Sequence, residues 1–404
     1  MNKVFILLTS LSAFMSMSCQ QATTFSVELP ASELDIPFSI NLDSLTALPE
    51  NSLSLWETSG GEDTAIPFQV SETNPRRLYW TIRPQDGLTK RTYKISKAAP
   101  EKFDDIKVVN DNGALVIRSG DKDLLSYQYE TVYPPAGQDS HYKRSGFIHP
   151  LQTLNGQTLT RIQPPDHYHH YGIWNPWTRT LFEQDTVDFW NIRGGQGTVR
   201  FAEFVSQADG PVFAEYTALH EHVVFKKDST EKIALNELQT VRVYKPGTSN
   251  DYYIVDITSN LSCASESPLL IIAYRYGGLG WRATEYWHKG NSEMLTSEGN
   301  TRDNTDNTKA KWIIVYGELP EDDEGGIVML SHTSNYNHPE PLRVWDKKST
   351  GGRGDVFVNF APTKDKDWLL QPGNIYTLKY RLVVFNGKMT KEKAESAWVS
   401  FTSP

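Results

Sequence analysis

The chain has 404 residues, and its 40 basic against 49 acidic side chains give a net charge of −9 without a basic run. A nucleic acid or an anionic membrane surface is therefore not expected as a partner. The length allows two domains, or one large β domain with a smaller companion. Aromatic residues make up 12% of the chain, a composition that favours strands.

The first residues have the pattern of a processing signal. A basic residue precedes an apolar stretch over residues 4–17, and a small residue then precedes Cys19. This resembles a bacterial lipoprotein signal, so we expect residues 1–18 to be removed and Cys19 to carry the only membrane anchor. No acidic run follows, which favours a periplasmic location and leaves surface exposure open. Cys263 then has no disulfide partner, and one cysteine cannot form a thiolate metal site.

Residues 21–100 are predicted to form a small β-sandwich of the immunoglobulin or fibronectin kind. Short alternating apolar and polar runs recur there, separated by turn clusters such as Ser59–Gly61. The expected strands are Phe25–Leu29, Ile36–Ile40, Leu53–Trp56, Arg77–Ile82 and Arg91–Ile95. The segment contains no histidine, so we expect it to support the fold rather than to catalyse.

Residues 106–404 are predicted to form one large antiparallel β-sandwich, which makes the chain all-β. Strand patterns follow one another without alternating helices. They include Ala114–Arg118, Leu125–Tyr129, Thr198–Phe201, Val241–Tyr244, Tyr252–Ile257, Leu269–Tyr274, Trp312–Tyr316 and Tyr376–Phe385. Only Lys388–Trp398 has a helix-forming composition.

Arg161–Arg193 concentrates the residue types that carry chemistry. His167, His169 and His170 precede Trp174 and further tryptophans on a segment that prolines and glycines keep irregular. Imidazoles, carboxylates and indoles on such a segment suit a polar pocket with aromatic walls. The alternative is a long loop whose aromatic rings cap the core and whose histidines hydrogen-bond to the backbone.

Two further segments add arginines, carboxylates and amides. Tyr274–Arg302 offers guanidinium groups for carboxylates or hydroxyls, together with possible acids or bases. Ser331–Trp345 offers amides, an arginine and an indole, which suit a polyhydroxylated ligand. A strand with ordinary salt bridges and a solvated loop are the alternatives for these two segments.

A metal site stays open as a weaker hypothesis. His220 and His222 share one face of an expected strand and could join the histidines of the first segment around zinc or iron. Their spacing is not diagnostic, and the motif H-E-x-x-H is absent. We therefore expect no metal or other cofactor, with a divalent ion as the exception to test.

Several separated motifs, in order, resemble the PmoA-like family of bacterial secreted proteins. They are HYHHYGIW, DFW, YRYGGLGWRAT, TSEGNTR, SNYNHPEPLRVW and VNFAPTK, within residues 110–390. Tyr171 and Ile173 stand where the family's usual motif has arginine and leucine. The resemblance implies a β-sandwich akin to galactose mutarotase and a carbohydrate-utilisation context. A methane oxygenase label attached to the family does not fit, because those subunits are helical membrane proteins.

These observations favour a carbohydrate-active enzyme, a hydrolase, lyase or epimerase, whose partner is an oligo- or polysaccharide. A non-catalytic glycan-binding lipoprotein and a metal-dependent oxidoreductase are the alternatives. The catalytic candidates are His169, His170, Glu298 and His338. The substrate-binding candidates are Trp174, Asp188, Trp190, Arg275, Arg282, Arg302, Asn335, Asn337, Glu340, Arg343 and Trp345. Hydrolysis would need two of Asp188, Glu285, Glu298 and Glu340 at a defined separation.

Overall fold

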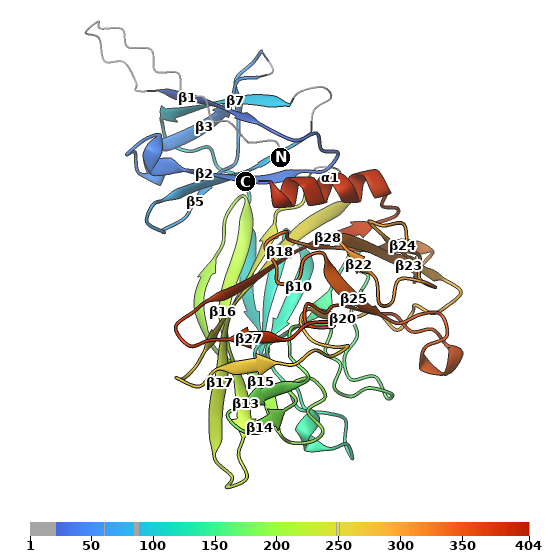
Figure 1. Cartoon of the computed structure of the whole chain (residues 1–404). Coiled ribbons are helices and arrows are strands. Elements are labelled where there is room, and N and C mark those ends of the chain that lie inside the picture. The colour runs from blue at the N-terminus through green and yellow to red at the C-terminus, as the bar shows by residue number, and fades with distance from the viewer. Residues whose placement is uncertain (1–21, 60, 85–88, 248, 250, 404) are drawn as a thin grey trace, which may run out of the picture. The chain divides into compact units, whose positions relative to one another are not determined.

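The computed structural model describes residues 22–59, 61–84, 89–247, 249 and 251–403, so the predicted signal and Cys19 lie outside it. The described chain divides into two compact units (Figure 1). Unit 1 takes the residues up to Ile106 together with 210–213 and 392–404, and unit 2 takes 107–209 and 214–391. The predicted all-β class is confirmed, with several antiparallel sheets.

Unit 1 consists of antiparallel strands around one apolar core. One sheet has the order β1 (Thr23–Glu28), β7 (Lys90–Lys97), β3 (Leu53–Glu57), β4 (Thr64–Ala65). Another has the order β2 (Ile36–Asn41), β6 (Arg77–Ile82), β5 (Gln69–Val70). Alternation along the strands buries one side of each, so that Trp80 packs edge-on against Phe25 and Tyr93.

The predicted C-terminal helix is present with different bounds. Helix α1 spans Lys391–Thr402, whereas composition predicted Lys388–Trp398. It buries Ala394 and Ala397. Of the residues 106–404 predicted as one domain, 210–213 and 392–404 group with unit 1 in the division by contacts.

Two large sheets and a small one build unit 2. Sheet I has the order β22 (Lys309–Ala310), β25 (Glu340–Val344), β26 (Phe357–Phe360), β20 (Gly280–Arg282), β12 (Ile173–Trp174), β11 (Phe147–Leu151), β10 (Lys122–Gln128), β9 (Ala114–Ser119), β8 (Ile106–Asp111). Sheet II has the order β15 (Gly197–Ala208), β16 (Phe213–Phe225), β17 (Glu231–Tyr244), β18 (Tyr252–Cys263), β28 (Tyr376–Asn386), β24 (Asp323–Ser331), β23 (Trp312–Leu319), β21 (Ser292–Thr296). The small sheet has the order β14 (Asp185–Val187), β13 (Thr180–Phe182), β19 (Leu269–Ile271), β27 (Trp368–Leu370).

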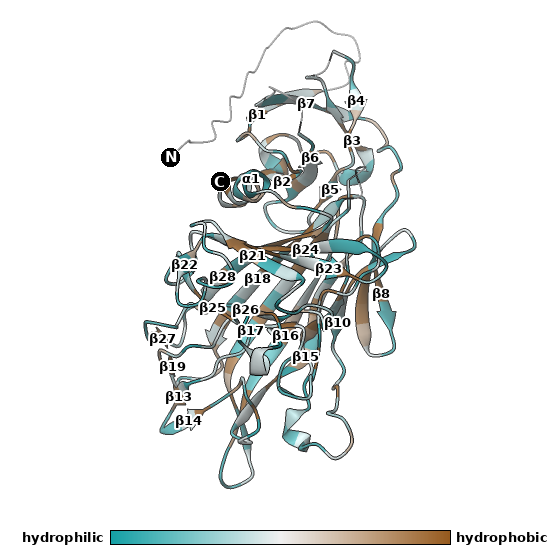
Figure 2. Ribbon diagram, turned by 90° about the vertical axis from the view of Figure 1, so that its right-hand side faces the viewer, coloured by the Kyte–Doolittle hydropathy of each residue, from teal (hydrophilic) through white to brown (hydrophobic). Residues whose placement is uncertain are grey.

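Side chains from sheets I and II meet in a shared core, as in a β-sandwich. Tyr127 of β10 lies 4.6 Å from Tyr216 of β16 between ring centroids. Tyr253 of β18 donates a 2.9 Å hydrogen bond to the backbone oxygen of Leu124. Hydrophobic and hydrophilic stretches lie side by side within the strands (Figure 2). This arrangement leaves the outer face of sheet I available to carry polar groups.

In the described part of the chain, no helix is both long and apolar enough to cross a membrane.

Candidate functional site

Strand register gives sheet I one chemically distinct face. Residues opposite each other on antiparallel strands point to the same side, as do residues two apart along a strand. The register aligns one row across four strands: Arg343, Asn359, Gly280 and Trp174. Two positions along, Arg282 lies opposite Phe357 on the same side. Arginines and large aromatic rings therefore share this face.

The other face of the same strands is apolar and belongs to the core. Its residues are Leu342, Val344, Val358, Phe360, Trp281, Ile173 and Ile148, all buried. Glu340 has the parity of Leu342 and Val344 on β25, so its side chain points to the opposite side from Arg343.

The absence of a side chain at Gly280 lets a tryptophan lie on the sheet. A Cβ atom at this position would lie 2.8 Å from a ring carbon of Trp190. Trp190 packs on Trp174 at 5.0 Å and on Tyr276 at 5.7 Å between ring centroids. Asp188 fixes the turn that places Trp190, since its carboxylate accepts hydrogen bonds from the backbone N–H groups of Trp190 and Asn191, each 2.8 Å. Asp188 therefore positions the ring.

The predicted histidine segment lies on this face. After the Pro164–Pro165 pair, hydrogen-bonded turns fold the chain back so that the three imidazoles meet. The ring centroids of His167 and His170 are 4.7 Å apart, as are those of His169 and His170. We call the following group the histidine face: His167, His169, His170, Trp174, Trp190, Tyr276, Arg282, Arg343, Trp345 and Phe357.

Trp345 connects the histidines to a buried cation. Its ring centroid lies 4.8 Å from that of His167, and the Arg282 guanidinium lies 4.6 Å from the Trp345 ring. Arg282 is fully buried and pairs with Asp355, while Asp166 lies 3.4 Å away. Burial of this charge is compensated by the two carboxylates.

Asp166 and His167 form a hydrogen-bonded dyad at the edge of the face. The Nδ1 of His167 lies 2.8 Å from Oδ2 of Asp166, and the two side chains are 34% and 30% exposed. Burial opposes the charge of Asp166, but the His167 hydrogen bond and the Arg282 charge outweigh it and hold the pKa of Asp166 well below its usual range. An ionised Asp166 leaves Nε2 of His167 as the nitrogen able to accept a proton.

The two other histidines are held neutral. Burial, followed by the nearby charges of His167, Arg144 and Arg282, lowers the pKa of His169 to about 3. Burial also lowers the pKa of His170 well below its ordinary value. Both imidazoles therefore retain one lone pair and one N–H at neutral pH.

Unpartnered buried polar atoms gather on the histidine face. In the described chain, the buried atoms without a hydrogen-bond partner include Nδ1 of His170, Nε1 of Trp174, one terminal nitrogen of Arg282 and Nε of Arg343. Buried polar groups are usually satisfied, so each exception needs an explanation. Four exceptions on one face point to a ligand or water with several hydrogen-bonding groups.

Arg343 lies at the opposite edge of the face. It pairs with Asp306 at 2.8 Å and donates a 3.1 Å hydrogen bond to the Tyr276 hydroxyl, which also accepts from Trp345. Arg275 is exposed, with its guanidinium 5.3 Å from the Tyr276 ring. Two of the four predicted binding arginines, Arg275 and Arg343, thus contact Tyr276, a residue that sequence reasoning missed.

Several predicted site residues have other partners. Glu298 lies on the exposed turn after β21 and accepts from Ser297. Arg302 is buried and donates to backbone oxygens, including that of His288 at 3.1 Å. It fixes the loop that carries Asp355. Asn337 bonds to Asp365 at 2.6 Å and accepts from Lys309.

Glu340 belongs to a buried group behind the sheet. It accepts hydrogen bonds from Ser331 at 2.5 Å, Asn335 at 2.7 Å and Tyr380 at 3.0 Å. Burial outweighs these hydrogen bonds and raises the pKa of Glu340 to about 7. His338 lies 3.4 Å from Ser331, and burial, then the Lys311 charge, lowers its pKa. The predicted catalytic residues are therefore not brought together: His169 and His170 lie on the histidine face, His338 lies beside this buried group, and Glu298 lies on an exposed turn.

His220 and His222 form a third group inside the sandwich. Their nitrogens lie 3.7 and 3.2 Å from Oε2 of Glu237, whose other oxygen accepts from Ser259 at 2.6 Å and Asn175 at 2.8 Å. The sequence analysis joined His220 and His222 to the histidines of the first segment around one metal, whereas the structure places them with Glu237. No group of three or more His, Cys, Asp or Glu side chains among the described residues could hold a metal ion.

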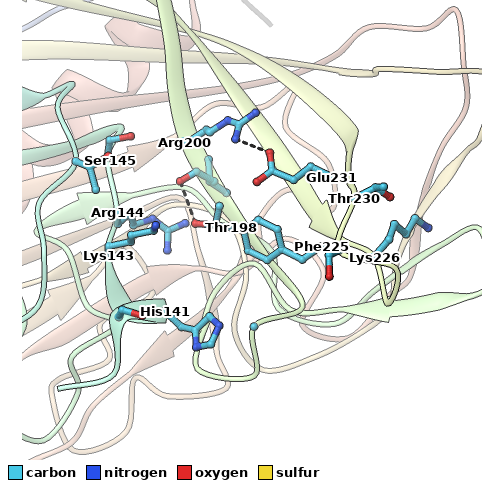
Figure 3. Close-up of a pocket in the computed structure, with 15 residues that line it drawn as sticks. His141, Lys143, Arg144, Ser145, Thr198, Arg200, Phe225, Lys226, Thr230 and Glu231 are labelled. Atoms are coloured by element: carbon cyan, nitrogen blue, oxygen red, sulfur yellow. Dashed lines mark hydrogen bonds and ion pairs between the residues drawn. The ribbon is translucent and has the colours of Figure 1, made fainter.

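Figure 3 shows a pocket of about 580 Å³. The short helix η3 (Ser140–Tyr142) and the residue after it connect this pocket to the histidine segment. Tyr142 packs 6.5 Å from His169 between ring centroids and its backbone oxygen accepts from the Tyr171 hydroxyl, whereas His141 and Lys143 line the pocket. Sequence reasoning missed this pocket.

Sequence analysis named His167 without a catalytic role and did not name Tyr276 or Phe357, which complete the histidine face. It also did not select Arg161, Asp166 and Asp355, which form ion pairs beside the face. An adjacent acid and histidine after a proline pair was the available signal for the dyad. Nothing in the sequence alone indicated that β26 brings Phe357 beside Arg282.

A family model described as "Family of unknown function (DUF6807)" matches residues 114–399. No curated protein matches the chain. The matched range covers most of unit 2, including every residue of the histidine face. The chain therefore belongs to this family of unknown function.

Proposed function

We propose that the protein acts on a carbohydrate by proton transfer at the histidine face, with His167 as the proton-transferring group and Asp166 as its positioning residue. The observation that carries the proposal is the Asp166–His167 hydrogen bond of 2.8 Å beside the Trp345 ring and the Arg282 guanidinium. A partly exposed imidazole whose tautomer is fixed by an ionised carboxylate is suited to general acid–base catalysis.

The residues around the Asp166–His167 pair can bind a hydroxylated ring. Trp345 and Tyr276 offer aromatic surfaces, and the neutral His170 and the Arg343 guanidinium have buried nitrogens without a partner in the described chain. A sugar presents apolar ring faces and hydroxyls that both donate and accept, which match this set.

The distribution of carboxylates favours a lyase or an epimerase over hydrolysis by a carboxylate pair. The Asp188 carboxylate accepts hydrogen bonds from the backbone of its own turn, Glu340 points into the core, and Glu298 lies on an exposed turn. Glu285 is 62% exposed, 3.8 Å from Arg161. Paired-carboxylate hydrolysis requires two such groups facing one bond, so a histidine-based reaction has the stronger support.

We also propose a fold type for each unit and a location for the protein. We place unit 2 with galactose-mutarotase-like sandwiches, unit 1 with immunoglobulin-like ones, and the chain with the PmoA-like family. We further propose that the protein is a periplasmic lipoprotein anchored through Cys19. A Cys19→Ala protein should then appear in the soluble fraction with an unchanged fold, and retention in the membrane fraction would contradict the anchor.

The test is a screen of oligo- and polysaccharides with three readouts: unsaturated products for a lyase, NMR of the sugar for an epimerase, and new reducing ends for a hydrolase. His167→Ala should lower turnover by about 10²–10⁴-fold. His288→Ala is the matched control, because His288 lies outside the histidine face, and should retain turnover. Equal losses in both variants, or none in either, would contradict the assignment.

A glycan-binding protein without turnover is the second candidate. The exposed Arg275 beside the Tyr274 and Tyr276 rings favours it, since stacking and hydrogen bonding suffice for binding. In that case the saccharides bind but no product forms in any of the three readouts.

A further inference from the structure

The pocket beside the histidine segment is built for a negatively charged group. Two basic side chains, Lys143 and Arg144, line one wall together with His141 and Ser145, and Arg200, Phe225 and Lys226 line the other (Figure 3). Glu231 is the only acidic lining residue in the described pocket. Concave surfaces with an excess of positive charge concentrate anions, so the partners of each lining cation decide what this pocket can hold.

The charges of two basic lining residues are already neutralised. Arg200 pairs with Glu221 at 2.9 Å and Glu231 at 2.8 Å. Lys226 pairs with Glu183 at 2.8 Å and Asp185 at 3.0 Å. These four acids leave Lys143 and Arg144 as the cations through which an anion would bind.

Arg144 is the strongest single indication. The residue is only 3% exposed, and the one side-chain hydrogen bond described for it runs from NH2 to the backbone oxygen of Phe189, at 3.2 Å. Its other terminal nitrogen is buried without a partner in the described chain. Burial lowers the pKa of Arg144 to about 10, so the guanidinium stays charged at neutral pH. The charges of Asp188 and Glu237 offset part of this burial, and an anion bound to the unpartnered nitrogen would offset more of it.

The remaining lining fits a hydroxylated ring rather than a bare ion. Hydroxyl groups line the pocket from Thr131, Ser140, Thr198, Ser229 and Thr230. Phe225 adds an aromatic surface, and the volume of about 580 Å³ is that of a small-molecule site. A simple inorganic anion would leave most of these groups unused.

We infer that this pocket binds an acidic saccharide unit, with its carboxylate or sulfate on Arg144 and Lys143 and its ring against Phe225 and the hydroxyls. The saccharide part of the inference rests on the proposed function, and the anionic part rests on the pocket alone. Because Tyr142 packs against His169 on the other side of the same short helix, a bound acidic unit would place a neighbouring sugar close to the histidine face.

The experiment measures binding to the full-length protein by calorimetry at low ionic strength. The probes are tetragalacturonate, a sulfated galactan tetrasaccharide, the matching neutral galactan tetrasaccharide, and inorganic sulfate. At least one acidic saccharide should bind. The neutral saccharide should bind at least about tenfold more weakly than that probe, and sulfate alone should also bind more weakly than that probe. The stronger of the two acidic probes identifies the charged group as carboxylate or sulfate.

Lys143→Glu should weaken binding of the acidic saccharide by about 10–100-fold, because it replaces a charge-assisted contact by repulsion. Lys143 is exposed, so Lys143→Glu should fold normally. It is therefore a safer test than a substitution of the buried Arg144, which would also disturb packing. Lys122→Glu is the matched control, an exposed lysine outside the pocket with the same charge change.

Four results would overturn the inference: no binding of either acidic probe, equal binding of the neutral probe, sulfate as tight as the saccharides, or equal effects of the two lysine variants. The proposed function fails separately. Binding of the acidic probe without turnover of any saccharide keeps the pocket assignment and removes the catalytic one. Turnover of a neutral saccharide that needs His167, without binding of acidic probes, does the reverse.

Discussion

The histidine face and the His220–Glu237–His222 group combine the same residue types in different surroundings. Glu237 is fully buried and receives hydrogen bonds from Ser259, Asn175 and His222, with His220 3.7 Å away. Asp166, in contrast, is 30% exposed and holds a histidine that is also partly exposed. The first arrangement ties strands together inside the sandwich, and the second presents a polar pair to a ligand.

Imidazole–carboxylate contacts alone therefore do not identify a functional site. What distinguishes the histidine face is the partial exposure of its Asp166–His167 pair, since buried atoms without a partner occur in both groups, Nδ1 of His222 and Oδ1 of Asn175 in the internal one. The internal group is a network whose members hold one another, and such networks act mainly on stability.

The largest expected effect separates the two groups by stability. Glu237→Ala leaves buried imidazoles, an amide and a hydroxyl without their common acceptor, so it should lower the free energy of unfolding by about 3–5 kcal/mol. Asp166→Asn, at a site about one-third exposed, should cost about 1 kcal/mol or less. Urea denaturation of both variants measures this, and equal losses would remove the distinction.

A pH series on Glu340 tests the buried group behind sheet I. Its pKa of about 7 lies above the ordinary 4.5, so the folded protein binds this proton more tightly than the unfolded chain. The resulting stability is present below about pH 4.5 and is lost as the pH rises toward 7, by about 3 kcal/mol in total. Glu340→Gln should abolish this loss in denaturation measured from pH 4.5 to 7.5. A parallel pH dependence in wild type and variant would contradict the buried, neutral carboxyl.

Gly280→Ala tests the packing of Trp190 on the sheet. The added Cβ would lie 2.8 Å from the indole, so the ring must move, at a cost of about 1–3 kcal/mol. Gly194→Ala is the control, since its added Cβ meets nothing closer than 3.6 Å. Thermal unfolding and tryptophan fluorescence should change only in the first variant, and an unchanged Gly280→Ala spectrum would place Trp190 elsewhere.

The smallest expected effect is that the NMR signals of the His169 imidazole show no pH transition. Its lowered pKa of about 3 means that the neutral form stabilises the fold above about pH 6.5 and that this contribution is lost only as the pH falls toward 3. The His169 imidazole signals should stay constant between about pH 5 and 8. A transition near pH 6.5 would show that His169 is solvated, contrary to the packing of the face.

Much of the fold follows from alternation in the sequence. The predicted strands Tyr252–Ile257 and Tyr376–Phe385 lie within β18 and β28. Long runs of strand-forming residues predict a strand and its buried side clearly. Strands β12 and β20, with two and three residues, carry too little pattern to be predicted. Yet their pairing is what brings the histidine segment beside Arg282.

The site could be predicted only in part, for reasons that differ by residue. The parity of β25 already separated Glu340 from Arg343, since they are three positions apart on one strand, and this signal was not used. Asp188 could not be told from a binding residue without the turn that it closes. The unpartnered charge of Arg144 arises from long-range packing and has no local signature.

The most direct test of the central claim is turnover of Asp166→Asn and Glu237→Ala on the saccharide found in the screen, normalised to the folded fraction of each protein. The account predicts that Asp166→Asn loses about 10²-fold or more in kcat/KM at nearly wild-type stability, because His167 loses its orienting carboxylate. It predicts that folded Glu237→Ala retains turnover within about tenfold. Wild-type turnover in Asp166→Asn, or a loss in folded Glu237→Ala as large as that expected for Asp166→Asn, would contradict the assignment of the histidine face as the functional site.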